Sequence, residues 1–98
     1  MLELNLRTAS GDISAFKKIV SDGISEERKK LEYALDRTYK IIKKYEDEHE
    51  MSSEEFLQRF QGGEVDETGD LFEWWAELKV TKELEEKLHM VESIEICQ

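Results

Sequence analysis

A stripe of mostly apolar residues runs through the middle of the chain. Its members, separated by four, three, four and three positions, are Leu31, Leu35, Thr38, Ile42 and Tyr45. This alternation is the a/d pattern of helices that pack along one another, so it predicts a long helix over 25–50. Because such a helix is longer than a compact chain of 98 residues needs, we expect the stripe to form the seam of a homodimer.

A second helix is predicted by a capping box. The Ser52 hydroxyl can accept the Glu55 backbone N–H while the Glu55 side chain reaches back toward Ser52. Met51 and Phe56 occupy the positions of a hydrophobic staple around this start. Gly62 and Gly63 follow, so we expect a short helix over 53–61.

A third helix is predicted over 71–92, with Asp70 and Glu73 as a second capping box. Its apolar and small positions are Trp74, Trp75, Leu78, Thr81, Leu84, Leu88 and Val91. Two long helices therefore flank a short one. The fold class expected is mainly α, a long helical hairpin with a short intervening helix.

The two ends of the chain carry weaker patterns. Alternation of Leu2, Leu4 and Leu6 with polar residues predicts a short strand over 1–8. A short helix over 12–22 is expected next, ending at Gly23. The tail from Ser93 onward alternates weakly, which fits either a strand or a frayed helix end. No repeat is visible, so 1–98 is expected to be one helical domain.

Composition supports this prediction and narrows the classes of function. Charged residues make up 39% of the chain and proline is absent, as in long amphipathic helices. No apolar run reaches the roughly 18 residues that a membrane span requires. The single cysteine, Cys97, cannot form an internal disulfide, so we expect a reducing, cytoplasmic location.

The net charge of −10 is distributed unevenly. Residues 46–77 contain twelve acidic side chains and one basic side chain, whereas 1–45 has a small positive excess. A segment this acidic would be repelled by phosphate backbones, which argues against nucleic acid as a direct ligand and favours a basic protein partner. The alternative is a solvated surface that keeps the protein soluble.

Two Glu-x-x-His pairs, Glu46 with His49 and Glu86 with His89, have the spacing used in di-iron helical bundles. The second pair lies off the apolar stripe of its helix, and in a hairpin the two histidines would lie at opposite ends. Solvated helix ends explain these pairs better than a metal site does. No nucleophile–base pair or phosphate-binding loop is visible either, so we expect no cofactor, no metal and no enzymatic activity.

Adjacent tryptophans mark the candidate binding segment. Trp74 and Trp75 point about 100° apart on a helix, so at least one is expected to be partly exposed and to anchor an interface. The alternative is that the core of the chain covers both. The residues predicted to bind a partner are Glu64, Asp66, Glu67, Asp70, Trp74 and Trp75.

The middle third of the chain also resembles a known family. The residues that carry the resemblance are Lys44-Tyr45, Glu50 to Phe56, Phe60, Gly63-Glu64, Asp70 and Phe72-Glu73-Trp74. Together they are similar to a pattern in small prokaryotic antitoxin proteins. The resemblance implies an inhibitor that neutralises a small basic toxin, often a nuclease, by covering its active surface. The alternative from another class is a self-assembling structural protein without enzymatic activity.

Overall fold

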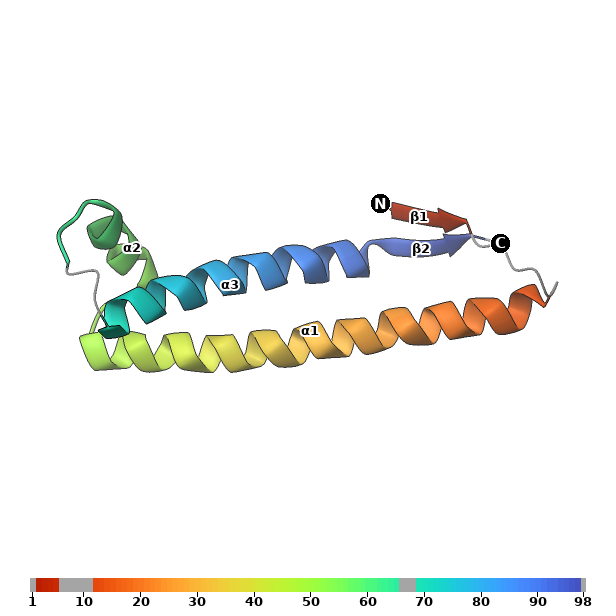
Figure 1. Ribbon diagram of the computed structural model, residues 1–98, viewed down its shortest axis with the longest axis horizontal. Coiled ribbons are helices and arrows are strands. Elements are labelled where there is room, and N and C mark those ends of the chain that lie inside the picture. Colours follow the sequence, from red (N-terminus) through yellow and green to blue (C-terminus); the bar gives the residue numbers. More distant parts are fainter. Residues whose placement is uncertain (1, 6–11, 66–68, 98) are drawn as a thin grey trace.

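The computed structural model describes residues 2–5, 12–65 and 69–97. Its elements in chain order are β1 (Leu2–Asn5), α1 (Ile13–His49), α2 (Ser53–Gln61), α3 (Gly69–Glu92) and β2 (Ile94–Cys97) (Figure 1). The protein is mainly helical, as the sequence predicts, with one long helix and a second helix packed against it. Its extents are 61 × 21 × 18 Å, so the molecule is a rod.

Helix α1 is continuous over 37 residues, so the prediction of separate helices over 12–22 and 25–50 is wrong. It begins at Asp12, whose carboxylate accepts the backbone N–H of Ala15 at 3.0 Å. Gly23 lies inside the helix and does not have the positive φ of a helix-ending glycine. A glycine inside a helix costs about 1 kcal/mol relative to alanine, which is less than breaking the hydrogen-bonded ladder would cost.

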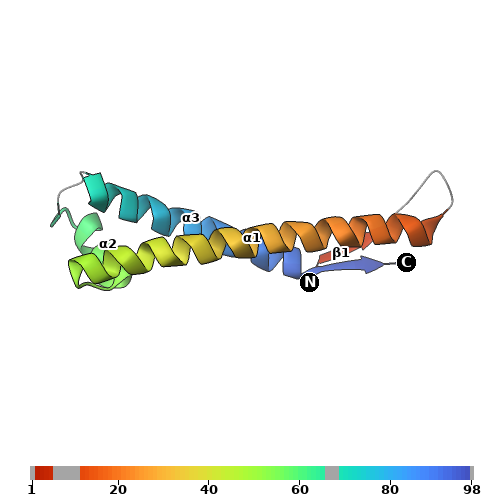
Figure 2. The ribbon, with the colours of Figure 1, turned by 90° about the horizontal axis from the view of Figure 1, so that it is seen from below.

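The predicted dimer seam is buried within a single chain. Helix α3 runs alongside α1 in the opposite direction in both views (Figures 1 and 2). The seam residues that it leaves only 4–8% exposed are Leu31, Leu35, Thr38 and Ile42, while Tyr45 is half-buried. Covering this stripe therefore does not require a second copy, and the reason for expecting a dimer through it no longer holds.

Two threonines lie in the contact between α1 and α3 without breaking it. The buried Thr38 hydroxyl donates to the backbone oxygen of Leu35 at 2.9 Å. The Thr81 hydroxyl of α3 donates to the backbone oxygen of Glu77 at 2.8 Å. Each hydroxyl is thus satisfied within its own helix, so burying it leaves no unpaired polar group.

The aromatic core lies at the end where α1, α2 and α3 meet. Trp74 is completely buried, and its ring is parallel to that of Phe56 with centroids 4.0 Å apart. The rings of Tyr45 and His49 stack nearby, at 5.9 and 5.5 Å. The Trp74 Nε1–H donates to the Ser53 hydroxyl at 3.1 Å. This tryptophan therefore joins all three helices.

Helix α2 starts with the Ser52 half of the predicted capping box, whereas the Glu55 carboxylate, expected to reach back toward Ser52, accepts from Arg59 at 2.8 Å. The Ser52 hydroxyl accepts the backbone N–H of Glu55 at 3.1 Å. The carboxylate of Glu46, in the last turns of α1, accepts the backbone N–H of Ser53 at 2.9 Å. The short turn between α1 and α2 is therefore held by side chains from both of its sides.

The other end of the rod carries the strands. β1 and β2 form a parallel two-stranded sheet in which Leu2 pairs with Ile94 and Asn5 pairs with Cys97. This sheet brings the two ends of the chain together, far from the aromatic core (Figure 1). None of the helices in the described ranges combines the length and apolar character that crossing a membrane requires.

Candidate functional site

An aromatic ladder, which we define as Phe60, Trp75 and Phe72, leads from the core to the surface of α3. Phe60 is buried, and its ring lies 5.7 Å from that of the half-buried Trp75. The Phe72 ring lies 5.5 Å from that of Trp75 and is 50% exposed. The Lys79 ammonium lies over the Trp75 ring, 4.7 Å from its centroid. Trp75 therefore has three packing partners, and the ladder is open to solvent at Phe72.

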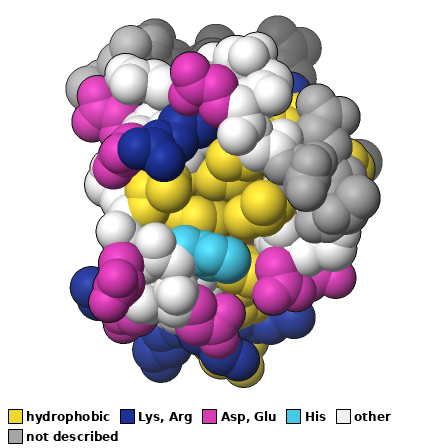
Figure 3. All heavy atoms as spheres, turned by 90° about the vertical axis from the view of Figure 1, so that its left-hand side faces the viewer, with side chains coloured by type: hydrophobic (Ala, Val, Ile, Leu, Met, Phe, Trp, Pro, Cys, Tyr) yellow, Lys and Arg dark blue, Asp and Glu magenta, His cyan; other side chains and the backbone are white. Residues whose placement is uncertain are grey.

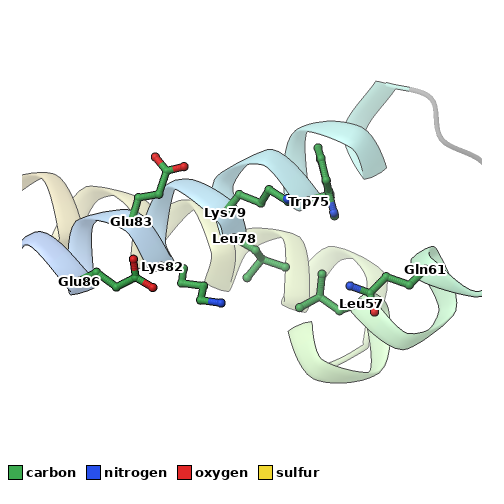
Figure 4. Close-up of a pocket in the computed structure, with 8 residues that line it drawn as sticks. All are labelled: Leu57, Gln61, Trp75, Leu78, Lys79, Lys82, Glu83 and Glu86. Atoms are coloured by element: carbon green, nitrogen blue, oxygen red, sulfur yellow. The ribbon is translucent and has the colours of Figure 1, made fainter.

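A groove of about 450 Å³ lies between α2 and α3 beside this ladder. It is lined by Leu57, Gln61, Trp75, Leu78, Lys79, Lys82, Glu83 and Glu86. In Figure 4, Leu57 and Leu78 point toward each other across its floor. The groove therefore joins an apolar floor to a rim of mixed charge, a combination found at sites that receive side chains of a partner.

The end of the rod next to the ladder is apolar in the middle and acidic around it. Figure 3 shows hydrophobic side chains around a histidine on this face, with acidic side chains at the edges. The exposed acids of the surrounding turns are Glu48, Glu50, Glu54, Glu55, Glu64, Asp70 and Glu73. Basic side chains also lie on this face, above the apolar patch and along the lower edge in Figure 3. Arg59 of α2 is paired with Glu55 at 2.8 Å. We call the seven exposed acidic residues of this face the acidic rim.

The residues predicted to bind a partner differ in how exposed they are to solvent. Glu64 and Asp70 are exposed and belong to the acidic rim, and Trp75 lines the groove. Trp74 has no exposed surface, so its prediction as an interface anchor is wrong for this conformation. Asp66 and Glu67 lie outside the described residues.

Sequence reasoning did not single out Phe72 as an exposed aromatic residue. It lies three residues before Trp75, a spacing that places two side chains on one helical face. That spacing was visible in the sequence. Its exposure was not, because it depends on how α2 packs against α3.

Tyr45 links the seam to the acidic rim. Its hydroxyl donates to the carboxylate of Glu73 at 2.9 Å, joining α1 to α3. Burial raises the pKa of Tyr45 to about 12, helped by this hydrogen bond and by the negative charges of Glu73, Asp70 and Glu77. The phenol therefore keeps its proton and acts as a donor, not as a base, at neutral pH.

Of the two Glu-x-x-His pairs, which the sequence pattern indicates are solvated helix ends, only Glu86 with His89 has both residues exposed. The Glu46 carboxylate is engaged by Ser53 at the start of α2. Glu86 and His89 are both exposed on α3. His49 instead approaches Glu48 and Asp70, and the potential ligand atoms of these three residues lie within 4.8 Å of one another.

The titratable groups at this end, within the described ranges, are mostly exposed carboxylates. Relatives give no further guide to what binds here, since comparison with protein-family models, curated proteins and solved structures finds no match to this chain.

Proposed function

We propose that this chain is an antitoxin-like protein, which neutralises a basic partner protein by binding it with the aromatic ladder and the acidic rim. The observation that carries the proposal is the position of Phe72, half-exposed against Trp75 at the edge of the most acidic part of the chain. Exposed aromatic side chains beside a polar rim are the usual anchors of protein interfaces.

The ladder is prepared for binding before a partner arrives. Trp75 packs against Phe60 and Phe72, and the Lys79 ammonium lies over its ring. Ordering a side chain at an interface costs about 0.5–1.5 kcal/mol, and a side chain that is already packed avoids much of this cost. A partner that covers Phe72 and enters the groove would therefore gain most of the burial free energy.

The acidic rim accounts for the choice of partner. A small nuclease must present basic side chains to its nucleic acid, and the same side chains would be attracted to exposed carboxylates. Such attraction mainly speeds the encounter and selects against acidic partners, while buried anchors set the lifetime of the complex. An antitoxin that covers a basic active groove would need both properties.

The proposal is tested with the protein encoded by the neighbouring gene, both by growth rescue and by binding kinetics. Phe72→Ala should speed dissociation and cost on the order of 2 kcal/mol, about thirtyfold in Kd. The matched control is Tyr33→Ala, since that ring is 76% exposed on α1 and away from the ladder. If both variants neutralise the partner as well as the parent does, the ladder is not the interface.

The acidic rim is tested separately by charge reversal. Glu54→Lys with Glu64→Lys should slow association and weaken its dependence on salt, with little change in dissociation. Glu26→Lys with Glu27→Lys adds the same charge to exposed positions of α1 outside the acidic rim and serves as the control. Equal association rates for the two double variants would contradict a steering role for the rim.

Self-assembly is the second candidate function. Two large apolar side chains in the first part of α1, Ile13 and Ile19, are 50% and 68% exposed. The two side chains are six residues apart and lie about 120° apart around the helix. A homodimer through the more exposed Ile19 would cover that side chain without opening the seam. Sedimentation of the parent and of Ile19→Glu distinguishes the two functions, because the antitoxin proposal does not depend on this surface.

A further inference from the structure

We infer that Glu48, His49 and Asp70 form a binding site for a divalent transition-metal ion such as Zn²⁺. This inference goes beyond the proposed function and does not depend on it. The potential ligand atoms of the three residues lie within 4.8 Å of one another. They join the last turn of α1 to the first turn of α3, two segments that are 21 residues apart in the chain between His49 and Asp70.

The separation of the ligand atoms is close to what a metal ion needs. Ligands bound tetrahedrally to Zn²⁺ at 2.0–2.2 Å lie about 3.4 Å from one another. Glu48 and Asp70 have exposed side chains, so changes of rotamer can close the remaining distance of up to about 1.4 Å. No movement of the helices is required.

The site opens onto a hollow with room for water ligands. This hollow has a volume of about 310 Å³, and its lining includes Glu48 and Asp70 together with Tyr45 and Glu73. Three protein ligands and an open position filled by water are a common arrangement for Zn²⁺. Lys44 also lines the hollow, and its ammonium works against a second cation there.

The surroundings of His49 support a metal site independently of the two carboxylates. Its ring is stacked on the buried Trp74 at 5.5 Å, so its orientation is fixed by packing. Its Nε2 atom is buried and has no hydrogen-bond partner among the described residues. A buried polar atom without a partner is unfavourable, and a metal ion bound at Nε2 would supply the missing partner.

The ligand types select the class of metal. Imidazole with carboxylates suits Zn²⁺, Co²⁺, Ni²⁺ and Mn²⁺, whereas Mg²⁺ and Ca²⁺ prefer sites made of oxygen alone. Two carboxylates also balance the charge of a divalent cation. The negative end of the α1 dipole, where Glu48 and His49 lie, favours a cation further.

Bound metal would act as a clamp. It would tie the end of α1 to the start of α3 and so close the segment 50–69, which contains α2. The acidic rim surrounds this point, so neutralising Glu48 and Asp70 would also reduce the negative charge next to the aromatic ladder. Metal would thus stabilise the fold at the end of the rod where the proposed partner binds.

The inference is tested on the isolated chain, without any partner protein. Zn²⁺ should raise the melting temperature and bind with a stoichiometry of one, whereas Mg²⁺ at the same concentration should do neither. In a Trp75→Phe background the remaining tryptophan, Trp74, lies against His49. Bound Ni²⁺ or Co²⁺ should therefore quench its fluorescence.

Variants identify the ligands. Asp70→Asn and Glu48→Gln change exposed side chains and should each weaken Zn²⁺ binding at least tenfold without unfolding the protein. His49→Gln should abolish the quenching, while His89→Gln, at an exposed position of α3, is the matched control and should bind like the parent. Lys44→Gln should bind more tightly, because it removes a competing charge.

Two results would overturn the inference. One is a response to Zn²⁺ that is no larger than the response to Mg²⁺. The other is Zn²⁺ binding that the Asp70→Asn and Glu48→Gln variants retain in full. Neither result would affect the proposed function, because that is tested through Phe72 and partner binding in the absence of added metal.

Discussion

At the scale of single residues, the two adjacent tryptophans have separate roles. Trp74 contacts Phe56, Tyr45 and His49 and is completely buried, whereas Trp75 belongs to the aromatic ladder. The spacing of residues in the sequence indicates which tryptophan is buried. Trp74, Leu78 and Thr81 follow one another at intervals of four and three, the same alternation as the α1 seam. That register places Trp74 in the seam of α3 and leaves Trp75 outside it.

The exposure of Phe72 and the surroundings of His49 could not be predicted in the same way. Both depend on how α2 folds back against α1 and α3, and a helical period does not contain that information. Glu46 illustrates the difference. The sequence pairs it with His49 by spacing, but in the structure its carboxylate accepts the Ser53 N–H, because the first N–H groups of α2 need acceptors.

Tyr45 gives a prediction about pH. Its pKa is raised from 10.0 to about 12 in the folded protein. The folded state therefore keeps a proton that the unfolded chain has already lost, so this contribution to stability is fully present below pH 10 and declines between about pH 10 and 12. Tyr45→Phe should remove that part of the decline, as measured by urea unfolding at a series of pH values.

The control for this experiment is Tyr33→Phe, which changes a ring that is 76% exposed. It should leave the decline of stability with pH as in the parent. At neutral pH, Tyr45→Phe should also cost about 1 kcal/mol, because the Glu73 carboxylate loses its hydrogen-bond donor. An unchanged profile above pH 10 in Tyr45→Phe would mean that the phenol is not held by α3.

At the scale of elements, the main difference from the sequence prediction is the length of α1. The sequence predicts that a helix ends at Gly23, because glycine often ends helices in the left-handed conformation. Here the ion pairs Lys18–Asp22 and Lys29–Glu26, at 3.1 and 3.6 Å, lie on the two sides of Gly23 within one helix. Ending α1 would also expose backbone groups on both sides of the break, so the helix continues through the glycine.

Replacing two glycines tests this interpretation. Gly23→Ala should stabilise the protein by about 0.5–1 kcal/mol, because an added Cβ meets no atom within 4 Å and alanine is the better helix former. Gly63 also has open space around it, but its φ is +73°, so Gly63→Ala should destabilise. Thermal unfolding of both variants measures these changes in stability. Destabilisation by Gly23→Ala would indicate that the helix is interrupted there.

At the scale of the whole molecule, one chain forms an elongated rod whose core lies mainly at one end. The Cα radius of gyration is 19.3 Å, whereas a compact domain of this length would have about 12–13 Å. Helix α1 is about 55 Å long and α3 about 36 Å, so α3 covers only part of α1. The acidic rim, the aromatic ladder and the inferred metal site all lie at the end where α2 closes the rod.

The effect of a charged substitution in the seam depends on whether the seam is buried by α3 of the same chain or by a second chain. Leu35 is 5% exposed in the single chain because α3 covers it. A carboxylate at this position would lose its hydration without gaining a partner, a cost of several kcal/mol that is a large part of the stability of a small domain. Leu35→Glu should therefore unfold the protein, with loss of helical circular dichroism. If the seam were instead shared by two chains, the parent itself would sediment as a dimer.

Sedimentation and circular dichroism on the same samples separate these outcomes. Ile19→Glu is the matched control, since Ile19 also lies on α1 but is 68% exposed, and it should leave helicity at the level of the parent. A parent that sediments as a dimer, together with a Leu35→Glu variant that is monomeric and fully helical, would contradict burial of the seam by α3. A parent that sediments as a monomer, together with loss of helicity in Leu35→Glu and not in Ile19→Glu, would show that a single chain covers its own seam, because position 35 is then buried by packing within that chain.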